Sequence, residues 1–132
     1  MQYSVLIIDD EPAISVALMT RLEAAGYQVY HAINGLAGVE AAALHKPDLI
    51  ILDIKMPDIS GYETFERITR MSDLSEIPII FLSAHAQDDA RQRALDMGAA
   101  AFYSKPYNAP EIIQRISELL TVTQGEVGHS HA

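Results

Sequence analysis

The sequence predicts an α/β protein built on one doubly wound, parallel sheet of five strands, with five helices. Short segments rich in Val, Ile, Leu, Phe or Tyr alternate with stretches in which apolar residues return every three or four positions. The first, third and fourth of these short segments have no polar face, as expected of parallel strands that helices cover on both sides. The predicted strands are residues 5–8, 27–32, 49–52, 78–82 and 100–103.

Local chemistry marks the ends of the predicted helices. Pro12 suits the first turn of a helix, where its missing N–H would have no partner. Gly26 and Gly98 are placed to end helices in the left-handed conformation, which glycine adopts without strain. Two residue pairs have the spacing of a capping box: Ser60 with Glu63, and Asn108 with Glu111.

The composition limits the classes of function. Eighteen acidic against nine basic residues give a net charge of −9, which argues against direct binding to nucleic acid or to an anionic membrane surface. Cations and basic partner surfaces are favoured instead. The chain has no cysteine, so a reducing cytoplasm is the expected location. The N-terminus lacks the basic segment of a signal peptide, and no stretch approaches the roughly 20 apolar residues of a membrane span.

Polar residues stand where four of the five predicted strands end. In open α/β sheets, ligands bind outside the carboxyl ends of the strands, so these side chains are expected to meet at one edge. In chain order they are Asp9, Asp10, Glu11, Asp53, Ser83 and Lys105.

Taken singly, most of these residues have an ordinary explanation. Asp10 could cap a helix, and Lys105 could be a solvated lysine. Asp53 is harder to explain, because an uncompensated carboxylate beside a buried strand is costly or stays protonated. Neighbouring carboxylates also repel one another, and Mg²⁺ relieves this repulsion while leaving room for a phosphate oxygen. Together with a hydroxyl and an ammonium group, the pattern predicts magnesium-dependent phosphorylation of an aspartate.

Four motifs extend this pattern. They are Ile-Ile-Asp-Asp-Glu-Pro at 7–12, Leu-Asp-Ile-Lys-Met-Pro-Asp-Ile-Ser-Gly at 52–61, Leu-Ser-Ala at 82–84 and Ser-Lys-Pro-Tyr at 104–107. With these motifs the chain resembles the receiver domains of response regulators over residues 3–120. The resemblance implies a flavodoxin-like sheet with strand order 2-1-3-4-5 and a phosphorylation-dependent switch in two-component or phosphorelay signalling. The expected receiver domain spans residues 1–121.

The resemblance also implies a role for each site residue. Asp53 is the expected phosphoacceptor, charged by a sensor histidine kinase or a histidine phosphotransfer protein. Ser83 and Lys105 would contact the phosphoryl group. Ser83 and Phe102 would form a switch that alters the surface made by the fourth helix, fifth strand and fifth helix. The expected Mg²⁺ ligands are Asp10, Asp53, the backbone carbonyl of Lys55, and Asp9 through water.

Lys55 and His85 depart from the small or acidic residues expected two positions after the phosphoacceptor and after the switch hydroxyl. In this family both positions influence how fast the phosphoryl group is hydrolysed. We expect Lys55 and His85 to crowd the attacking water and to lengthen the phosphorylated lifetime. Alternatively, Lys55 points to solvent or pairs with Glu11 or Asp58.

The sequence gives less direct information on the signalling output and on the oligomeric state. Ala100 and Ala101 replace acidic residues that support a symmetric dimer in DNA-binding relatives, so a monomer or a weak dimer is expected. No DNA-binding segment follows Thr121, so signalling is expected to pass to an unknown protein target or through phosphoryl relay. The chain could be a stand-alone regulator or a receiver from a longer protein.

Residues 122–132 lose all apolar periodicity and are expected to form a flexible tail. His129 and His131 in this tail could bind a metal, but two histidines at a terminus are more often disordered or a remnant of cloning.

Three other functions compete with the switch. A phosphatase of the haloacid dehalogenase type needs a second acid where this chain has Lys55. A receiver-like module that is never phosphorylated would usually have lost a site residue, and here the set is complete. A flavin site lacks its phosphate-binding loop. No enzymatic activity is expected beyond self-phosphotransfer and slow autodephosphorylation.

Overall fold

The computed structural model describes residues 2–84 and 88–129, and within them five parallel strands form one sheet in the order β2-β1-β3-β4-β5. This is the predicted doubly wound, flavodoxin-like sheet. Every strand lies within one residue of its predicted bounds at each end. The strands are β1 (Ser4–Ile8), β2 (Gln28–Ala32), β3 (Leu49–Leu52), β4 (Ile79–Ser83) and β5 (Ala101–Ser104).

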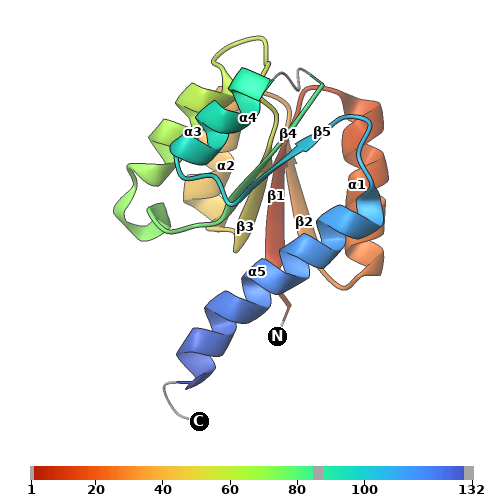
Figure 1. Ribbon diagram of the computed structural model, residues 1–132, viewed down its shortest axis with the longest axis vertical. Coiled ribbons are helices and arrows are strands. Elements are labelled where there is room, and N and C mark those ends of the chain that lie inside the picture. Colours follow the sequence, from red (N-terminus) through yellow and green to blue (C-terminus); the bar gives the residue numbers. More distant parts are fainter. Residues whose placement is uncertain (1, 85–87, 130–132) are drawn as a thin grey trace.

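Helices cover both faces of the sheet (Figure 1). One face is covered by α1 (Pro12–Ala24) and α5 (Ala109–His129). The other is covered by α2 (Gly35–His45), α3 (Gly61–Thr69) and α4 (Asp88–Asp96). A short 3₁₀ helix, η1 (Ser72–Leu74), precedes β4 and was not predicted.

Alternate residues of the central strands pack into two apolar clusters, one on each face. In β1, Val5 and Ile7 pack with α1 and α5, whereas Leu6 and Ile8 pack with α2, α3 and α4. Successive strand residues point to opposite faces, so a strand covered on both sides must be apolar throughout. This requirement explains the uninterrupted apolar runs in β1, β3 and β4.

The predicted helix ends are present. Pro12 is the first residue of α1. Gly26 and Gly98 have φ values of 98° and 105°, in the left-handed region. The two predicted caps accept backbone hydrogen bonds, Ser60 Oγ from Glu63 at 3.1 Å and Asn108 Oδ1 from Glu111 at 3.0 Å.

The last helix is longer than the apolar pattern indicates, because α5 continues to His129. Apolar periodicity reports which side chains are buried, whereas the backbone hydrogen bonds of a helix can continue without it. The flexibility of residues 122–132 stays a prediction, and His131 lies outside the described residues. In the described part of the chain, no helix combines the length and apolar character that crossing a membrane requires.

The loop between β3 and α3 runs very close to the start of α3. The N–H of Gly61 donates to the carbonyl oxygen of Ile54 at 2.6 Å. A Cβ added at Gly61 would collide with the carbonyl oxygen of Asp53 and lie 2.7 Å from the Cα of Ile54. The absence of a side chain at Gly61 therefore allows the backbone after Asp53 to take its position.

Replacing Leu6 by alanine tests the two-faced core. Leu6 is fully buried, and its truncation is expected to lower the free energy of unfolding by about 2–5 kcal/mol. The same change at Leu44, which is 76% exposed, should alter it by no more than about 0.5 kcal/mol. Urea denaturation measures both, and equal effects would contradict the assignment of Leu6 to the core.

Replacing Gly61 by alanine tests the close approach. If nothing obstructed the new methyl group, alanine would stabilise the helix by up to about 1 kcal/mol. Because the backbone of Asp53 and Ile54 occupies that space, we expect Gly61→Ala to lower the free energy of unfolding by about 1–3 kcal/mol. Urea denaturation measures the sign of the change in the free energy of unfolding, which decides between stabilisation and destabilisation.

Candidate functional site

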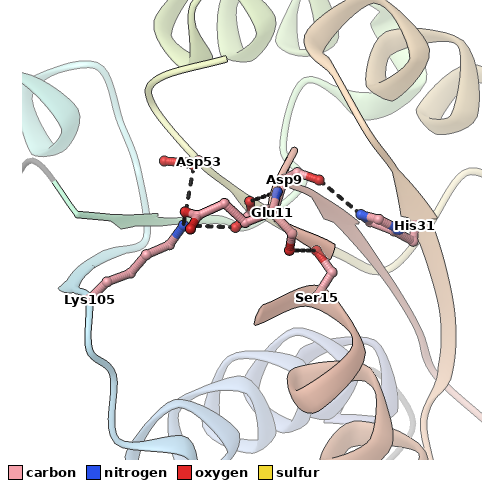
Figure 2. Close-up of polar contacts among 6 residues, drawn as sticks. All are labelled: Asp9, Glu11, Ser15, His31, Asp53 and Lys105. Carbon is pink, nitrogen blue, oxygen red and sulfur yellow. Dashed lines mark hydrogen bonds and ion pairs between the residues drawn. The ribbon is translucent and has the colours of Figure 1, made fainter. Parts of the chain in front are cut away.

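The carboxyl ends of four strands bring the predicted site residues to one edge of the sheet. Because neighbouring parallel strands end at the same edge, residues far apart in the chain meet there. Asp9 and Asp10 follow β1, Asp53 follows β3, Ser83 ends β4 and Lys105 follows β5. Figure 2 shows Asp9, Glu11 and Asp53 grouped around the end of the Lys105 side chain.

The Lys105 ammonium group contacts three carboxylates. Its Nζ lies 2.8 Å from Glu11 Oε1, 3.0 Å from Asp9 Oδ2 and 3.3 Å from Asp53 Oδ2. The side chain is only 6% exposed. Burial by itself lowers the pKa of Lys105, but the hydrogen bonds to Glu11 and Asp9 and the charge of Asp53 outweigh it and raise the pKa above its usual value. Lys105 is therefore a permanent positive charge in the site.

Asp53 is a buried acid with an altered proton affinity. Burial raises the pKa of its carboxyl, the Lys105 ammonium opposes this rise, and the charge of Asp9 adds to it. The net pKa is above the usual value. The single ammonium group therefore does not fully offset the burial of Asp53 beside a second acid.

Asp9 is held at every polar atom. Its Oδ1 accepts the N–H of Glu11 at 2.8 Å and its Oδ2 accepts from Lys105. Its own N–H donates to the carbonyl of Ala32, and its carbonyl accepts a hydrogen bond from His31 Nε2 at 2.9 Å (Figure 2). The Asp9 side chain is thereby fixed in the site.

The same acids could hold a cation. Asp9, Asp10 and Asp53 each offer a carboxylate oxygen, and these three atoms lie within 4.8 Å of one another. Asp9 and Asp53 are buried, whereas Asp10 is exposed. A donor set made only of oxygen fits a hard divalent ion such as Mg²⁺, whose charge would offset that of the neighbouring acids.

A cleft of about 440 Å³ lies over the acids, and Lys55 is one of the residues that line it. The lining residues are Asp10, Glu11, Asp53, Lys55, Met56, Pro57 and Ala84.

Lys55 itself is exposed, and within the described residues it forms no ion pair. The pairing with Glu11 or Asp58 that the sequence allowed is not formed. Glu11 contacts Lys105, and Asp58 accepts hydrogen bonds from the N–H groups of Gly35 and Leu36. His85, predicted to act with Lys55, lies outside the described residues.

The predicted switch residues lie on adjacent strands. Ser83 is fully buried at the end of β4, and Phe102 is buried in β5. The Arg91 guanidinium of α4 lies 5.4 Å from the centre of the Phe102 ring. Next to them a groove of about 530 Å³ runs along α4, β5 and α5. Movement of these residues stays a prediction.

Three contacts could not be found from the sequence. Asp58 caps the start of α2 from a loop more than twenty positions away, and His31 donates to Asp9 across β1 and β2. Desolvation raises the pKa of Asp58, but the hydrogen bonds from Leu36 and Gly35 outweigh it and hold the pKa below its usual value. Glu11 was seen as an acid at the strand end, but nothing in the sequence pointed to its contact with Lys105.

Replacing Asp53 by asparagine tests the cost of burying its charge. The folded state binds the Asp53 proton more tightly than the unfolded state, so the ionised carboxylate opposes folding above the raised pKa. Without divalent cations, D53N is expected to be more stable than the unmodified protein at neutral pH. The difference should shrink as the pH falls through the raised pKa and disappear below the ordinary value of 3.8.

Urea denaturation in a chelator at several pH values measures this difference. D73N is the matched control, because a hydrogen bond from Lys46 lowers the pKa of the exposed Asp73 and its removal should not stabilise the protein. A destabilised D53N at neutral pH would contradict the prediction.

Comparison with known proteins identifies the family of the chain. The family profile of the response regulator receiver domain matches residues 5–117. The DNA-binding dual master transcriptional regulator RpaA of Synechocystis is 37% identical over 119 residues, which cover 90% of this chain and 49% of that protein. The polar-differentiation response regulator DivK of Brucella anthropi is 33% identical over 120 residues, 91% of this chain and 98% of that protein. The chain thus spans about half the length of RpaA and nearly all of DivK.

Solved structures show the same fold. A CheY-like response regulator receiver domain from Methanospirillum hungatei superposes with a TM-score of 0.88 at 28% identity, covering 96% of this chain and 99% of that one. The family profile, the relatives and the fold therefore show that the chain belongs to the response regulator receiver domains, a family of signalling proteins.

Proposed function

We propose that this chain is a phosphorylation-dependent switch of a two-component or phosphorelay system. Asp53 accepts the phosphoryl group from a phosphohistidine of a sensor histidine kinase or a histidine phosphotransfer protein. A carboxylate oxygen forms the new bond to phosphorus as the bond to the histidine nitrogen breaks. The observation that carries this proposal is the buried carboxylate of Asp53. It contacts the Lys105 ammonium group and lines a cleft that Asp10 and Glu11 also line.

The other site residues support the transfer. Asp10, Asp53 and the Lys55 carbonyl would bind Mg²⁺ directly, and Asp9 would bind it through water. When bound, the ion offsets the negative charge of the acids and of the phosphoryl oxygens. Lys105 donates to one phosphoryl oxygen, and Ser83 donates to another from the end of β4.

The output would be a shift between two conformers. A ligand shifts such an equilibrium only by interacting differently with the two states. The phosphoryl group interacts differently with the two conformers if Ser83 and Lys105 contact it in only one conformer. Phe102 then turns inward toward Ser83, which changes the surface of α4, β5 and α5.

We place this signalling in the cytoplasm, with an unknown protein target and a monomer or weak dimer as the working state. RpaA is described as DNA-binding, but the net charge of −9 leads us to propose that residues 1–132 do not bind nucleic acid directly.

Phosphorylation by a small phosphodonor tests the function. Incubation with acetyl phosphate and Mg²⁺ is expected to add one phosphoryl group, detected by intact mass. D53N should gain none, and a chelator should prevent the gain in the unmodified protein. A phosphoryl group retained by D53N would contradict the assignment of Asp53. Sustained hydrolysis of a phosphate ester would instead favour a phosphatase.

Replacing Lys55 tests control of the phosphorylated lifetime. If its side chain crowds the attacking water, Lys55→Ala should speed dephosphorylation by about two- to fivefold, the scale of an exposed charged contact. Lys55→Met keeps most of the side-chain volume, so dephosphorylation of this variant should remain slow. Decay of the isolated phosphoprotein measures both, with His85→Ala as the parallel test. Unchanged decay in the alanine variants would contradict the proposal.

A further inference from the structure

The three carboxylates around Lys105 differ in how firmly they are held. The Asp9 side chain is 4% exposed and is anchored by the N–H of Glu11, and Asp53 is similarly buried. The Glu11 side chain is 52% exposed, yet it makes the shortest contact with Lys105 Nζ, at 2.8 Å. Glu11 is thus the most accessible partner of the ammonium group.

The Lys105 ammonium group has no spare donor. An ammonium group carries three N–H bonds, and three carboxylate oxygens already lie within hydrogen-bonding distance of it. Phosphorylation would free the N–H that contacts Asp53, the longest of the three contacts at 3.3 Å. To donate to the phosphoryl oxygens with a second N–H, or to move toward them, Lys105 must also weaken its contact with Asp9 or with Glu11. The contact with Asp9 is buried, so its loss would leave a desolvated carboxylate without its cation.

Of the two partners that are not phosphorylated, Glu11 can leave at the lower cost. Water can solvate its carboxylate after release, because half of the side chain is already exposed. It also lines the cleft into which a phosphoryl group on Asp53 would project, where two negative groups repel each other. Its side chain makes no hydrogen bond that caps α1, so its contact with Lys105 can be removed without uncapping the helix.

We propose that Glu11 is a positioning residue that restrains Lys105 in the unphosphorylated state and so opposes phosphoryl binding at Asp53. This inference rests on the proposed function. Molecules in which Lys105 has left Glu11 would bind the phosphoryl oxygens more readily, so the apparent affinity would fall as the fraction of such molecules falls. Glu11 thereby sets how readily the switch turns on.

Two substitutions separate the contact from the charge. Glu11→Asp keeps the negative charge in the cleft but shortens the side chain by one methylene group, which breaks the contact with Lys105. Glu11→Ala removes both. Glu23→Ala, in the exposed last turns of α1, removes one negative charge away from the site and is the matched control.

The experiment measures the affinity for beryllium fluoride, a phosphoryl analogue that binds carboxylates, at saturating Mg²⁺ determined for each variant. Glu11→Asp and Glu11→Ala are expected to bind it about two- to fivefold more tightly than the unmodified protein, the range for releasing one partly exposed ion pair. Glu23→Ala should match the unmodified protein. In ¹⁵N NMR spectra without ligand, the Lys105 ammonium hydrogens should exchange faster with water in both Glu11 variants.

The outcomes are distinguishable. Unchanged affinity in Glu11→Asp, with tighter binding in Glu11→Ala, would show an effect of charge alone and overturn the inference. Weaker binding in both would show that Glu11 holds Lys105 in place for the phosphoryl group, which also overturns it. If neither the unmodified protein nor D53N bound beryllium fluoride, the proposed function itself would fail, and the inference with it.

Discussion

The buried ammonium group of Lys105 is the interaction on which the site depends. Asp9 and Asp53 are buried side by side, and each would cost several kcal/mol as an isolated ion. Lys105 contacts both of them, although it follows them by 96 and 52 positions in the chain. The raised pKa of Asp53 shows that this compensation is incomplete. A cation bound by these acids would offset the remaining negative charge, and it would also offset the charge that a phosphoryl group brings.

The sheet makes such a costly arrangement possible. Two apolar clusters, one on each face, hold β1, β3 and β4 rigidly, and their carboxyl ends carry the acids. Backbone contacts then hold the loops beyond the strands. Gly61 lets the chain pass close behind Asp53, and His31 holds the carbonyl of Asp9. Core packing thus provides the stability that the polar edge lacks.

Burial divides the site residues into two groups. Asp9, Asp53 and Ser83 are buried, and their positions are set by the strands that carry them. Glu11 and Lys55 are exposed at the cleft. Change at the exposed positions costs little stability, so substitutions there would alter the proposed switch without disturbing the buried residues.

The sequence alone determined the sheet, its strands to within one residue, the caps at Ser60 and Asn108 and the set of strand-end residues. These features depend on local periodicity and on the rule that parallel strands end together. The length of α5 was seen only in the structure, because backbone hydrogen bonds carry the helix past its apolar pattern. Only the tertiary structure decided the partners of Lys105, Asp58 and His31. Those contacts join residues 22 to 96 positions apart, and no local pattern specifies which side chain meets which across such distances.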